Sequence, residues 1–424
     1  MTSTIMLGLF ALFMVSGSPI GYAMGLSAAI SLFITGEAPL LLLPQLFYTS
    51  AADINLLAVP LFILAGALMS ESGITDSIIR VSKAFAGHLK GGLAKANIMT
   101  NTFMAAISGS AVADAAAVGS IIIPAMKEEG YTPQFAVAVT SCSAMLAPIL
   151  PPSIIAIVYA SQAGLSVGHL FMTGIVPGLL GGVVFFILVH FLATRSGGVV
   201  RERVPAKERW MEALRAAPAA LLPVLIVGAL VSGIATPTET AAIAVAYAMV
   251  VAAVRNRFRF LGFYRAVVGA AILSSSVLVV IAGAALFGWV LTRAGAPQFV
   301  LSSILQLSSN PYIVMLIVLV ALFLMGTVLE PAPALILLLP LLISISTAMD
   351  YEPYSFAVAV IMMLVLGSVT PPVGVLAMIC ANIARIEYSK TFGAVVPFIL
   401  VWFALAFVVA YFPIVATLLP SLVF

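Results

Sequence analysis

The residues best suited to binding chemistry lie at two breaks in otherwise apolar stretches. Small polar residues interrupt one stretch at 108–110 and another at 325–327, and a Pro-Pro pair follows each break, at 151–152 and at 371–372. A proline inside a helix removes a backbone hydrogen bond and leaves carbonyl oxygens without their helical partners. Free carbonyls and hydroxyl groups form an all-oxygen site that suits Na⁺, and exposed helix N-termini attract a carboxylate. The pattern therefore predicts two sodium sites near a site for an anionic substrate.

Each break belongs to one copy of a weak internal repeat. The first copy runs SGSAVADAAAVGSIIIP, YTPQFAVAV and LAPILPPS, and the second runs MGTVLEPAPALILLLP, YEPYSFAVAV and GSVTPPVG. The landmarks have matching separations: 15 residues from Gly109 to Pro124 and 14 from Gly326 to Pro340, then 18 from Pro133 to Pro151 and from Pro353 to Pro371. A single Pro-Pro pair more often marks a packing kink than a site. The paired and equally spaced set favours ion binding.

Acidic residues stand at matching places in the two copies, four or five residues after each break. Asp114 and Glu330 are either indirect ligands of the ion or helix-capping acids, and the sequence leaves both roles open. Glu239 begins a short apolar segment, where stabilisation of the first helical turn is the favoured role. The three histidines have neither metal-ligand nor catalytic-triad spacing, so the sequence predicts no enzyme.

Composition places all these residues in a membrane protein. Of 424 residues, 63% are hydrophobic and only 8% are charged, whereas an ordinary soluble domain carries about 25% charged residues. The net charge of +3 is too small, and its basic residues too scattered between apolar spans, for a nucleic-acid binder. The cysteines Cys142 and Cys380 lie far apart, which excludes a disulfide framework. The predicted class is a polytopic, all-α membrane protein.

A helix needs about 20 apolar residues to cross the hydrocarbon core. Stretches of roughly that length or more occupy 4–34, 38–70, 133–160, 167–194, 216–233, 237–254, 266–291, 355–384 and 391–420. Asp53 and Asn55 interrupt the second stretch, so the N-terminal quarter holds two or three crossings. Residues 98–126 have arms of about a dozen residues, or about 18 Å, and are predicted to form a re-entrant hairpin. Residues 311–348 form its partner, with arms long enough that two full crossings stay open.

Lysine and arginine set the orientation, because cytoplasmic loops carry an excess of both. They gather in four clusters, whose members are Arg80, Lys83, Lys90 and Lys95; Arg195, Arg201, Arg203, Lys207, Arg209 and Arg215; Arg255, Arg257, Arg259 and Arg265; and Arg385 and Lys390. All four clusters fit on the cytoplasmic side, which leaves Arg293 as the one basic residue outside. The two hairpins then enter from opposite sides, so the repeat is predicted to be inverted. The segment 195–215 suits a membrane-surface helix or a cytoplasmic loop equally well.

These patterns divide the chain into six parts. They are 1–97, N-terminal spans and a cytoplasmic arm; 98–194, the first repeat core; 195–265, basic linkers with two scaffold spans; 266–310, a scaffold span and the arm of the second repeat; 311–390, the second repeat core; and 391–424, the C-terminal span. Each repeat core holds one hairpin and one broken helix.

Five short segments carry a resemblance to a known family. They are LLAVPLFILAGALM at 56–69, SGSAVADAAAVGSIIIPAM at 108–126, GIATPTETAAIAVAYA at 233–248, NPY at 310–312 and TPPVG at 370–374. Over essentially its whole length the chain resembles the large membrane subunit of the tripartite ATP-independent periplasmic (TRAP) transporters, which is DctM-like. The resemblance implies an inverted-repeat, elevator-like secondary transporter of the ion-transporter-superfamily type, in a bacterial inner membrane. It also implies a four-helix DctQ-like membrane subunit and a DctP-like periplasmic binding protein as partners.

The resemblance further implies a function and its residues. The function is Na⁺-coupled import of a small organic acid (a C4-dicarboxylate, a keto acid or a sugar acid), with no cofactor beyond Na⁺. Sodium site 1 would comprise Ser108, Gly109, Ser110, Asp114, Pro151 and Pro152. Sodium site 2 would comprise Gly326, Thr327, Glu330, Thr370, Pro371, Pro372 and Gly374. Substrate would bind between the tips, at Ser110, Thr327 and Ser153. The additional prolines Pro331 and Pro333 depart from the family pattern and leave the second tip less defined.

Other classes of protein stay open at this point. The nearest is a stand-alone Na⁺-coupled anion or dicarboxylate carrier of related fold, which would need no binding protein. A channel would show a continuous polar stripe along its helices, whereas the polar residues here gather at breaks. A membrane enzyme is the most distant alternative, because no nucleophile–base pair or metal cluster is evident.

Overall fold

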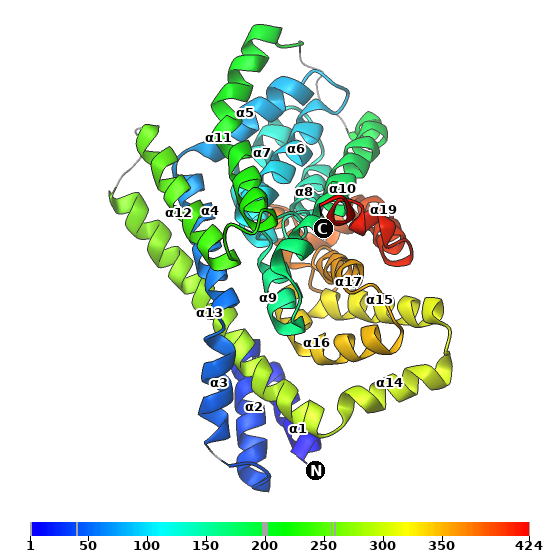
Figure 1. Cartoon of the computed structure of the whole chain (residues 1–424). Coiled ribbons are helices and arrows are strands. Elements are labelled where there is room, and N and C mark those ends of the chain that lie inside the picture. The colour runs from blue at the N-terminus through cyan, green and yellow to red at the C-terminus, as the bar shows by residue number, and fades with distance from the viewer. Residues whose placement is uncertain (1, 40, 197–201, 256, 258–259, 424) are drawn as a thin grey trace.

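The computed structural model describes residues 2–423, apart from residues 40, 197–201, 256 and 258–259, and apart from the side chains of 194–196. Within the described ranges every regular element is a helix (Figure 1). Eight of these helical segments are long and apolar enough to cross a membrane. The prediction of a polytopic α-helical membrane protein is therefore confirmed.

The first three helices of the chain lie at one end of the molecule, and the chain continues from them towards its middle (Figure 1). The elements of this N-terminal part are α1 (Thr2–Val15), α2 (Ile20–Thr35), α3 (Leu42–Ala51), η1 (Ile54–Leu57) and α4 (Ala58–Glu71). The apolar stretch 4–34 is two contacting helices rather than one, because Gly17 turns the chain with a positive φ of 79°. Asp53 ends the next segment as predicted, since its carboxylate accepts a hydrogen bond from the Asn55 amide and starts η1.

The next group of helices includes the first repeat. Its elements are α5 (Ile74–Ala86), α6 (Gly92–Ser108), α7 (Ala111–Glu128), α8 (Pro133–Ala144), α9 (Ile154–Ala163) and α10 (Val167–Ser196). Hairpin 1, which we define as α6 and α7, has arms of 17 and 18 residues. At 1.5 Å per residue the arms measure about 25 and 27 Å. The prediction that each arm has about a dozen residues was therefore wrong. The helix α6 starts before residue 98, and polar residues that interrupt the apolar pattern of the sequence there are buried in the structure.

In the described part of the chain, four helices lead into the second repeat, which begins at α15. The elements are α11 (Ala206–Val231), α12 (Pro237–Val254), α13 (Phe260–Arg293), α14 (Ala296–Leu307), α15 (Pro311–Val328), α16 (Pro331–Ala348), α17 (Pro353–Gly367), α18 (Val375–Ala384), η2 (Tyr388–Thr391), α19 (Phe392–Tyr411), α20 (Ile414–Thr417) and η3 (Pro420–Leu422). Hairpin 2, defined as α15 and α16, has arms of 18 residues each, and both are candidate membrane spans. Part of the basic segment 195–215 lies in α11, which starts at Ala206 and continues unbroken into the apolar span.

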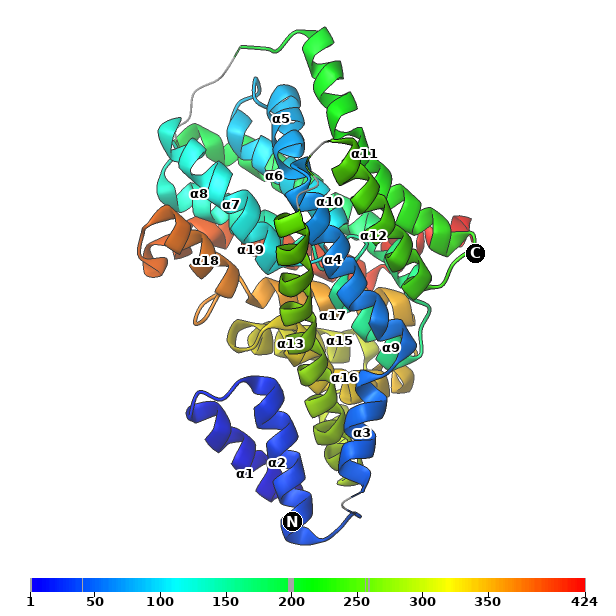
Figure 2. The same cartoon turned by 90° about the vertical axis from the view of Figure 1, so that its left-hand side faces the viewer.

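The two repeats share one succession of elements: a hairpin, then a helix that breaks at a Pro-Pro pair. Pro133 and Pro353 each begin a helix at its first position, as predicted. The second half of each broken helix packs against the hairpin of the other repeat, α9 against α16 and α18 against α7 (Figure 2). Each half of the molecule therefore depends on the other for its packing.

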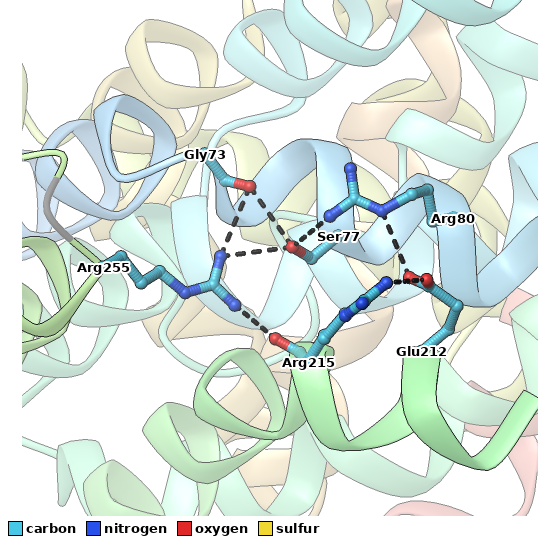
Figure 3. Close-up of polar contacts among 6 residues, drawn as sticks. All are labelled: Gly73, Ser77, Arg80, Glu212, Arg215 and Arg255. Carbon is cyan, nitrogen blue, oxygen red and sulfur yellow. Dashed lines mark hydrogen bonds and ion pairs between the residues drawn. The ribbon is translucent and has the colours of Figure 1, made fainter. Parts of the chain in front are cut away.

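A second group of helices lies beside this pair of repeats (Figure 1). α4 packs along α12 and α13, and α2 packs along α13, which runs the length of the group (Figure 1). At least one member of each of the first three basic clusters lies where α5, α11 and the end of α12 meet: Arg80, Arg215 and Arg255. There Glu212 pairs with Arg80, and Arg255 donates to Ser77 (Figure 3). Arg201 and Arg259, together with the Arg195 side chain, lie outside the described part of the chain.

Candidate functional site

The tip of hairpin 1 falls where the sequence predicts it, at residues 108–110. Ser108 ends α6, and Gly109 follows in the left-handed conformation with φ of 61°. Ser110 is the N-cap of α7, and its hydroxyl accepts a hydrogen bond from the Ala113 amide at 3.4 Å. A Cβ atom on Gly109 would overlap the carbonyl oxygen of Pro152. Only glycine therefore allows the tip to lie directly on the broken helix.

The break of that helix spans the residues between Ala144 and Ile154, and the Pro151-Pro152 peptide bond is cis. Proline has no amide hydrogen, and the break contains Pro148, Pro151 and Pro152, so it lacks three donors. The carbonyl oxygens of residues 149–152 accept no hydrogen bond from the described residues. Ser153 caps α9 and is fully buried, and its hydroxyl donates to the Pro148 carbonyl at 2.5 Å. The break thus presents free oxygens beside the tip of hairpin 1.

Glycines on neighbouring helices make this close packing possible. On α10, a Cβ atom at Gly174 would overlap the Ile149 carbonyl, and one at Gly178 would meet the Leu150 side chain at 2.6 Å. On α4, Gly66 faces the hairpin near its tip. A Cβ atom at Gly66 would lie 3.2 Å from the carbonyl oxygen of Ile107. Small residues at such spacing let membrane helices approach backbone to backbone. The first site is therefore enclosed by α4, α10 and its own hairpin.

The tip of hairpin 2 lies two residues later than predicted. Gly326 and Thr327 belong to the last turn of α15, and the chain leaves the helix at Leu329 and Glu330. Pro331 explains the shift, because a residue before proline is driven into an extended conformation and Glu330 has φ of −61° and ψ of 146°. A glycine inside a membrane helix does not end it when neighbouring helices support the backbone.

Hairpin 2 nevertheless contacts its own broken helix, as predicted. The Val373 amide donates a hydrogen bond to the Thr327 carbonyl at 3.3 Å. Gly326 and Gly367 meet so closely that a Cβ atom on either would overlap the other segment. The Pro371-Pro372 bond is also cis. The hydroxyl of Thr370 donates to the Leu366 carbonyl at 2.9 Å, which leaves its oxygen lone pairs free to accept.

The far side of the second break is covered by η2. Gly374 has a positive φ of 52° and begins α18, and a Cβ atom there would overlap the Tyr388 hydroxyl. The two breaks differ in exposure: Pro151, Pro152 and Ser153 are buried, whereas Pro372 is exposed. The second site is therefore the more open of the two.

The acidic residues of the two repeats have different surroundings. Asp114 is fully buried in the first turn of α7, and neither carboxylate oxygen has a hydrogen-bond partner. Glu330 is exposed at the N-cap of α16 without a capping hydrogen bond from its side chain. Glu239 forms a reciprocal capping box with Thr236, which is the role favoured from the sequence. Neither Asp114 nor Glu330 acts as a side-chain cap in this conformation.

Reasoning from the sequence missed a buried polar ladder between α6 and α8. Asn101 Nδ2 donates to Ser143 Oγ at 2.9 Å and to Asn97 Oδ1 at 2.8 Å, and Asn97 Nδ2 donates to Thr140 Oγ1 at 2.7 Å. All four side chains are fully buried. The available signal was the four-residue spacing of the two asparagines, which places both on one helix face.

A second missed contact joins the broken helix to the surrounding helices. The Ser161 hydroxyl on α9 donates to Asp53 Oδ2 at 2.7 Å, and the Thr238 hydroxyl at the start of α12 donates to the Ile54 carbonyl at 2.6 Å. The sequence analysis treated Asp53 only as an interruption of an apolar stretch. Its partner lies 108 residues away, so no local pattern could reveal it.

Paired hairpins and paired broken helices, packed in an all-helical bundle, define a polytopic membrane protein with the architecture of a transporter. The family model described as "Tripartite ATP-independent periplasmic transporter, DctM component" matches residues 7–415. The chain belongs to this family. The family resemblance drawn from the five short segments is thereby confirmed.

Relatives and a solved structure agree with this assignment. The chain is 31% identical to the sialic acid TRAP transporter large permease protein SiaM of Vibrio cholerae, over 96% of each protein. It is 35% identical to the isethionate TRAP transporter permease protein DctMQ of Oleidesulfovibrio alaskensis, over 96% of this chain and 65% of that protein. Its fold is similar to the YdaH transporter of Alcanivorax borkumensis, with a TM-score of 0.62, 13% identity and coverage of 88% and 86%. The relatives are permeases rather than enzymes.

Replacement of Gly109 by alanine tests the contact between tip and break. We expect Gly109→Ala to displace the tip, because both the positive φ and the Pro152 carbonyl oppose a Cβ atom. Gly164→Ala is the matched control, since Gly164 is also a helix C-cap with positive φ but has nothing within 4 Å. Thermal unfolding in detergent should show a clearly larger loss for Gly109→Ala. Equal losses would mean that backbone strain alone, and not the contact, matters.

Replacement of Asn101 by leucine tests the polar ladder. The change leaves the Asn97 amide oxygen buried without its donor, which we expect to cost about 1–2 kcal/mol. Thr102→Val is the control, because the Thr102 hydroxyl bonds only within its own helix, to the Ile98 carbonyl. The midpoint of thermal unfolding should fall for Asn101→Leu and change little for Thr102→Val. An unchanged midpoint in Asn101→Leu would contradict a stabilising role of the ladder.

Proposed function

We propose that this chain is the large membrane subunit of a TRAP transporter that uses the Na⁺ gradient to import a small organic acid. The observation that carries the proposal is the contact of each hairpin with the broken helix of its own repeat. Gly109 lies against the Pro152 carbonyl, and the Thr327 carbonyl accepts a hydrogen bond from Val373. In each repeat, therefore, a hairpin meets a broken helix at the place where helical hydrogen bonds are interrupted.

The proposed sodium sites use the oxygens at these two meeting points. Site 1 takes the free carbonyls of residues 149–152 together with the hydroxyls of Ser108 and Ser110. Site 2 takes the unwound segment 370–374 and Thr327. Unwound carbonyls at such breaks suit Na⁺, and free carbonyls at membrane depth need a partner other than lipid. An ionised, unpartnered carboxylate is costly to bury, so a cation or a proton beside Asp114 would complete site 1.

The proposed substrate lies between the two tips and is an anion. α7 and α9 present N-termini with serine caps at the first break, and α18 begins at the second. The positive ends of these helix dipoles favour a carboxylate without an arginine. Ser110 and Thr327 are the candidate hydroxyl contacts, and Ser153 would position α9, since its hydroxyl is engaged with the backbone. Sialic acid and isethionate, which the names of two relatives specify, are both small organic anions.

The proposed partners are a small four-helix membrane subunit and a periplasmic binding protein that delivers the substrate. The relative named DctMQ is longer than this chain, which covers 65% of it, and its name joins the two membrane components. The proposed location is a bacterial inner membrane, with the basic clusters on the cytoplasmic side.

The proposed mechanism is alternating access by an elevator-like movement of the two inverted repeats against the surrounding helices. The exchange of α9 and α18 between repeats supports movement of both repeats as one body. The helices α2, α4, α12 and α13 pack among themselves and would form the fixed scaffold. The Asp53–Ser161 hydrogen bond crosses from one group to the other.

Sodium binding can be tested without knowledge of the substrate. Thermal unfolding of the purified chain is followed in NaCl and in KCl at equal ionic strength. A ligand at a hundredfold excess over Kd stabilises the folded state by about 2.7 kcal/mol, so we expect a higher midpoint in NaCl. Ser110→Leu and Thr327→Leu should each reduce this difference, because a bulky apolar side chain would fill the proposed sites.

The controls for this test lie on the same hairpins. Ser120→Leu on α7 and Thr347→Leu on α16 make the same changes at exposed positions whose hydroxyls bond only to their own helices. They should keep the full difference between NaCl and KCl. No difference in the unaltered chain would contradict sodium coupling. Uptake of an organic acid by the chain alone, without partners, would favour the stand-alone carrier instead.

A disulfide between positions 53 and 161 tests the movement. In Asp53→Cys/Ser161→Cys, oxidation should abolish uptake in the reconstituted three-component system, and a reductant should restore it, because α9 could no longer leave η1. The native cysteines are both buried, and the single variant Asp53→Cys controls for them. Full uptake by the cross-linked protein would show that α9 and η1 do not separate during transport.

A further inference from the structure

A basic cavity lies at the end of the molecule where α5, α11 and α12 meet (Figure 3). It has a volume of about 280 Å³, and Asp76, Ser77, Arg80, Arg215, Arg255 and Arg257 contribute to its lining. None of these residues belongs to the hairpins or the broken helices. The cavity is therefore separate in sequence and in fold from the proposed transport sites.

One carboxylate serves two of the arginines. Glu212 Oε2 pairs with Arg80 Nε at 3.1 Å, and Glu212 Oε1 pairs with Arg215 Nη1 at 2.5 Å. Arg80 Nη2 also donates to Ser77 Oγ at 2.9 Å. Four arginines thus face two carboxylates, those of Glu212 and Asp76, so a net positive charge of about two remains at neutral pH.

Within the described residues, the Arg255 guanidinium donates its hydrogen bonds to neutral groups. Its Nη1 donates to Ser77 Oγ at 3.1 Å and to the Gly73 carbonyl at 3.4 Å, and its Nη2 donates to the Arg215 carbonyl (Figure 3). Partial burial, followed by the positive charges of Arg80 and Arg257, lowers the pKa of Arg255. Arg257 is exposed, and no side-chain partner for it occurs in the described chain. An anion between these guanidinium groups would relieve their mutual repulsion.

Exposed apolar side chains stand beside the same arginines. Leu214, which precedes Arg215, is 56% exposed, and Val254, which precedes Arg255, is 78% exposed. Trp210, on α11 one turn before Leu214, and Phe260 at the start of α13 are also exposed. Apolar spans begin or end at this level on α11, α12 and α13. The cavity therefore sits where lipid headgroups meet the hydrocarbon.

We propose that this cavity binds the phosphate of an anionic phospholipid headgroup, whose acyl chains run along the exposed apolar residues of α11, α12 and α13. Arginine is suited to phosphate because its planar guanidinium donates two parallel hydrogen bonds. Basic pockets between membrane helices bind anionic headgroups in this way. The lipid would add contacts at the place where α11 packs on both α5 and α12. This proposal does not depend on the substrate or on sodium coupling.

The test compares lipids on the purified full chain. Thermal unfolding in detergent is measured as a function of added dioleoyl-phosphatidylglycerol, dioleoyl-phosphatidylcholine or inorganic phosphate. We expect stabilisation by phosphatidylglycerol at the lowest concentration. Arg257→Gln should raise the half-saturating concentration of phosphatidylglycerol about fivefold. This change corresponds to the roughly 1 kcal/mol that one arginine contributes near an anionic surface. Arg257 makes no side-chain contact within the described residues, so its replacement leaves the fold intact.

Matched variants and the other ligands decide the outcome. Arg203 is exposed, lies outside the cavity and belongs to the same basic cluster as Arg215. Arg203→Gln also removes one positive charge, and this variant should keep the full response to phosphatidylglycerol. Arg255→Gln should lower both the response and the basal midpoint, because it also breaks contacts to α5 and α11. Equal stabilisation by phosphatidylcholine, or an unchanged response in Arg257→Gln, would overturn the proposal. Stabilisation by inorganic phosphate at the same concentration would overturn the assignment to a lipid and indicate a soluble phosphate ligand.

Discussion

The structure depends on one constraint: backbone carbonyls that leave a helix inside a membrane must be buried in protein or bound to something. Two helices of this chain break at Pro-Pro pairs, and the surrounding structure is arranged around those breaks. Glycines allow neighbouring segments to pack closely against these breaks. Gly109 and Gly174 pack against the first break, and Gly326 meets Gly367 at the second. Any larger residue at these positions would separate the segments and expose the carbonyls to lipid. Glycine at these four positions is therefore required by the close packing at the two breaks.

The exchange of half-helices couples the movement of the two repeats. α9 leaves its own break to pack on α16, and α18 leaves the second break to pack on α7 and α8. A shift of either hairpin would therefore carry a half-helix of the other repeat with it. The polar ladder of Asn97, Asn101, Thr140 and Ser143 adds hydrogen bonds between α6 and α8 within the first repeat. The two repeats are thus packed together as one unit, and the Asp53–Ser161 hydrogen bond lies at their border with the helices of the other group.

Local rules predicted the features that local residues determine. Ser108, Gly109 and Ser110 combine a left-handed glycine with an N-cap serine, and the helix break occurs there. The second tip was placed two residues early because Gly326 was given more weight than Pro331, although proline restricts the residue before it whatever the surroundings. The glycine contacts, the partners of Asn97 and Asn101 on α8 and the Tyr388 cover over Gly374 were not predictable. Each joins residues of different elements, so no spacing along one helix records them.

The two halves are similar in backbone and unlike in chemistry. In the first repeat the break is buried, and Asp114 lies in the hairpin with no hydrogen-bond partner. In the second repeat the break is partly exposed, and Glu330 faces outward. A buried, ionised carboxylate is costly when no charge of opposite sign lies beside it. An exposed carboxylate carries no such cost. The two breaks therefore differ in burial and in the acidic residue beside them, although both repeats place a hairpin against a broken helix.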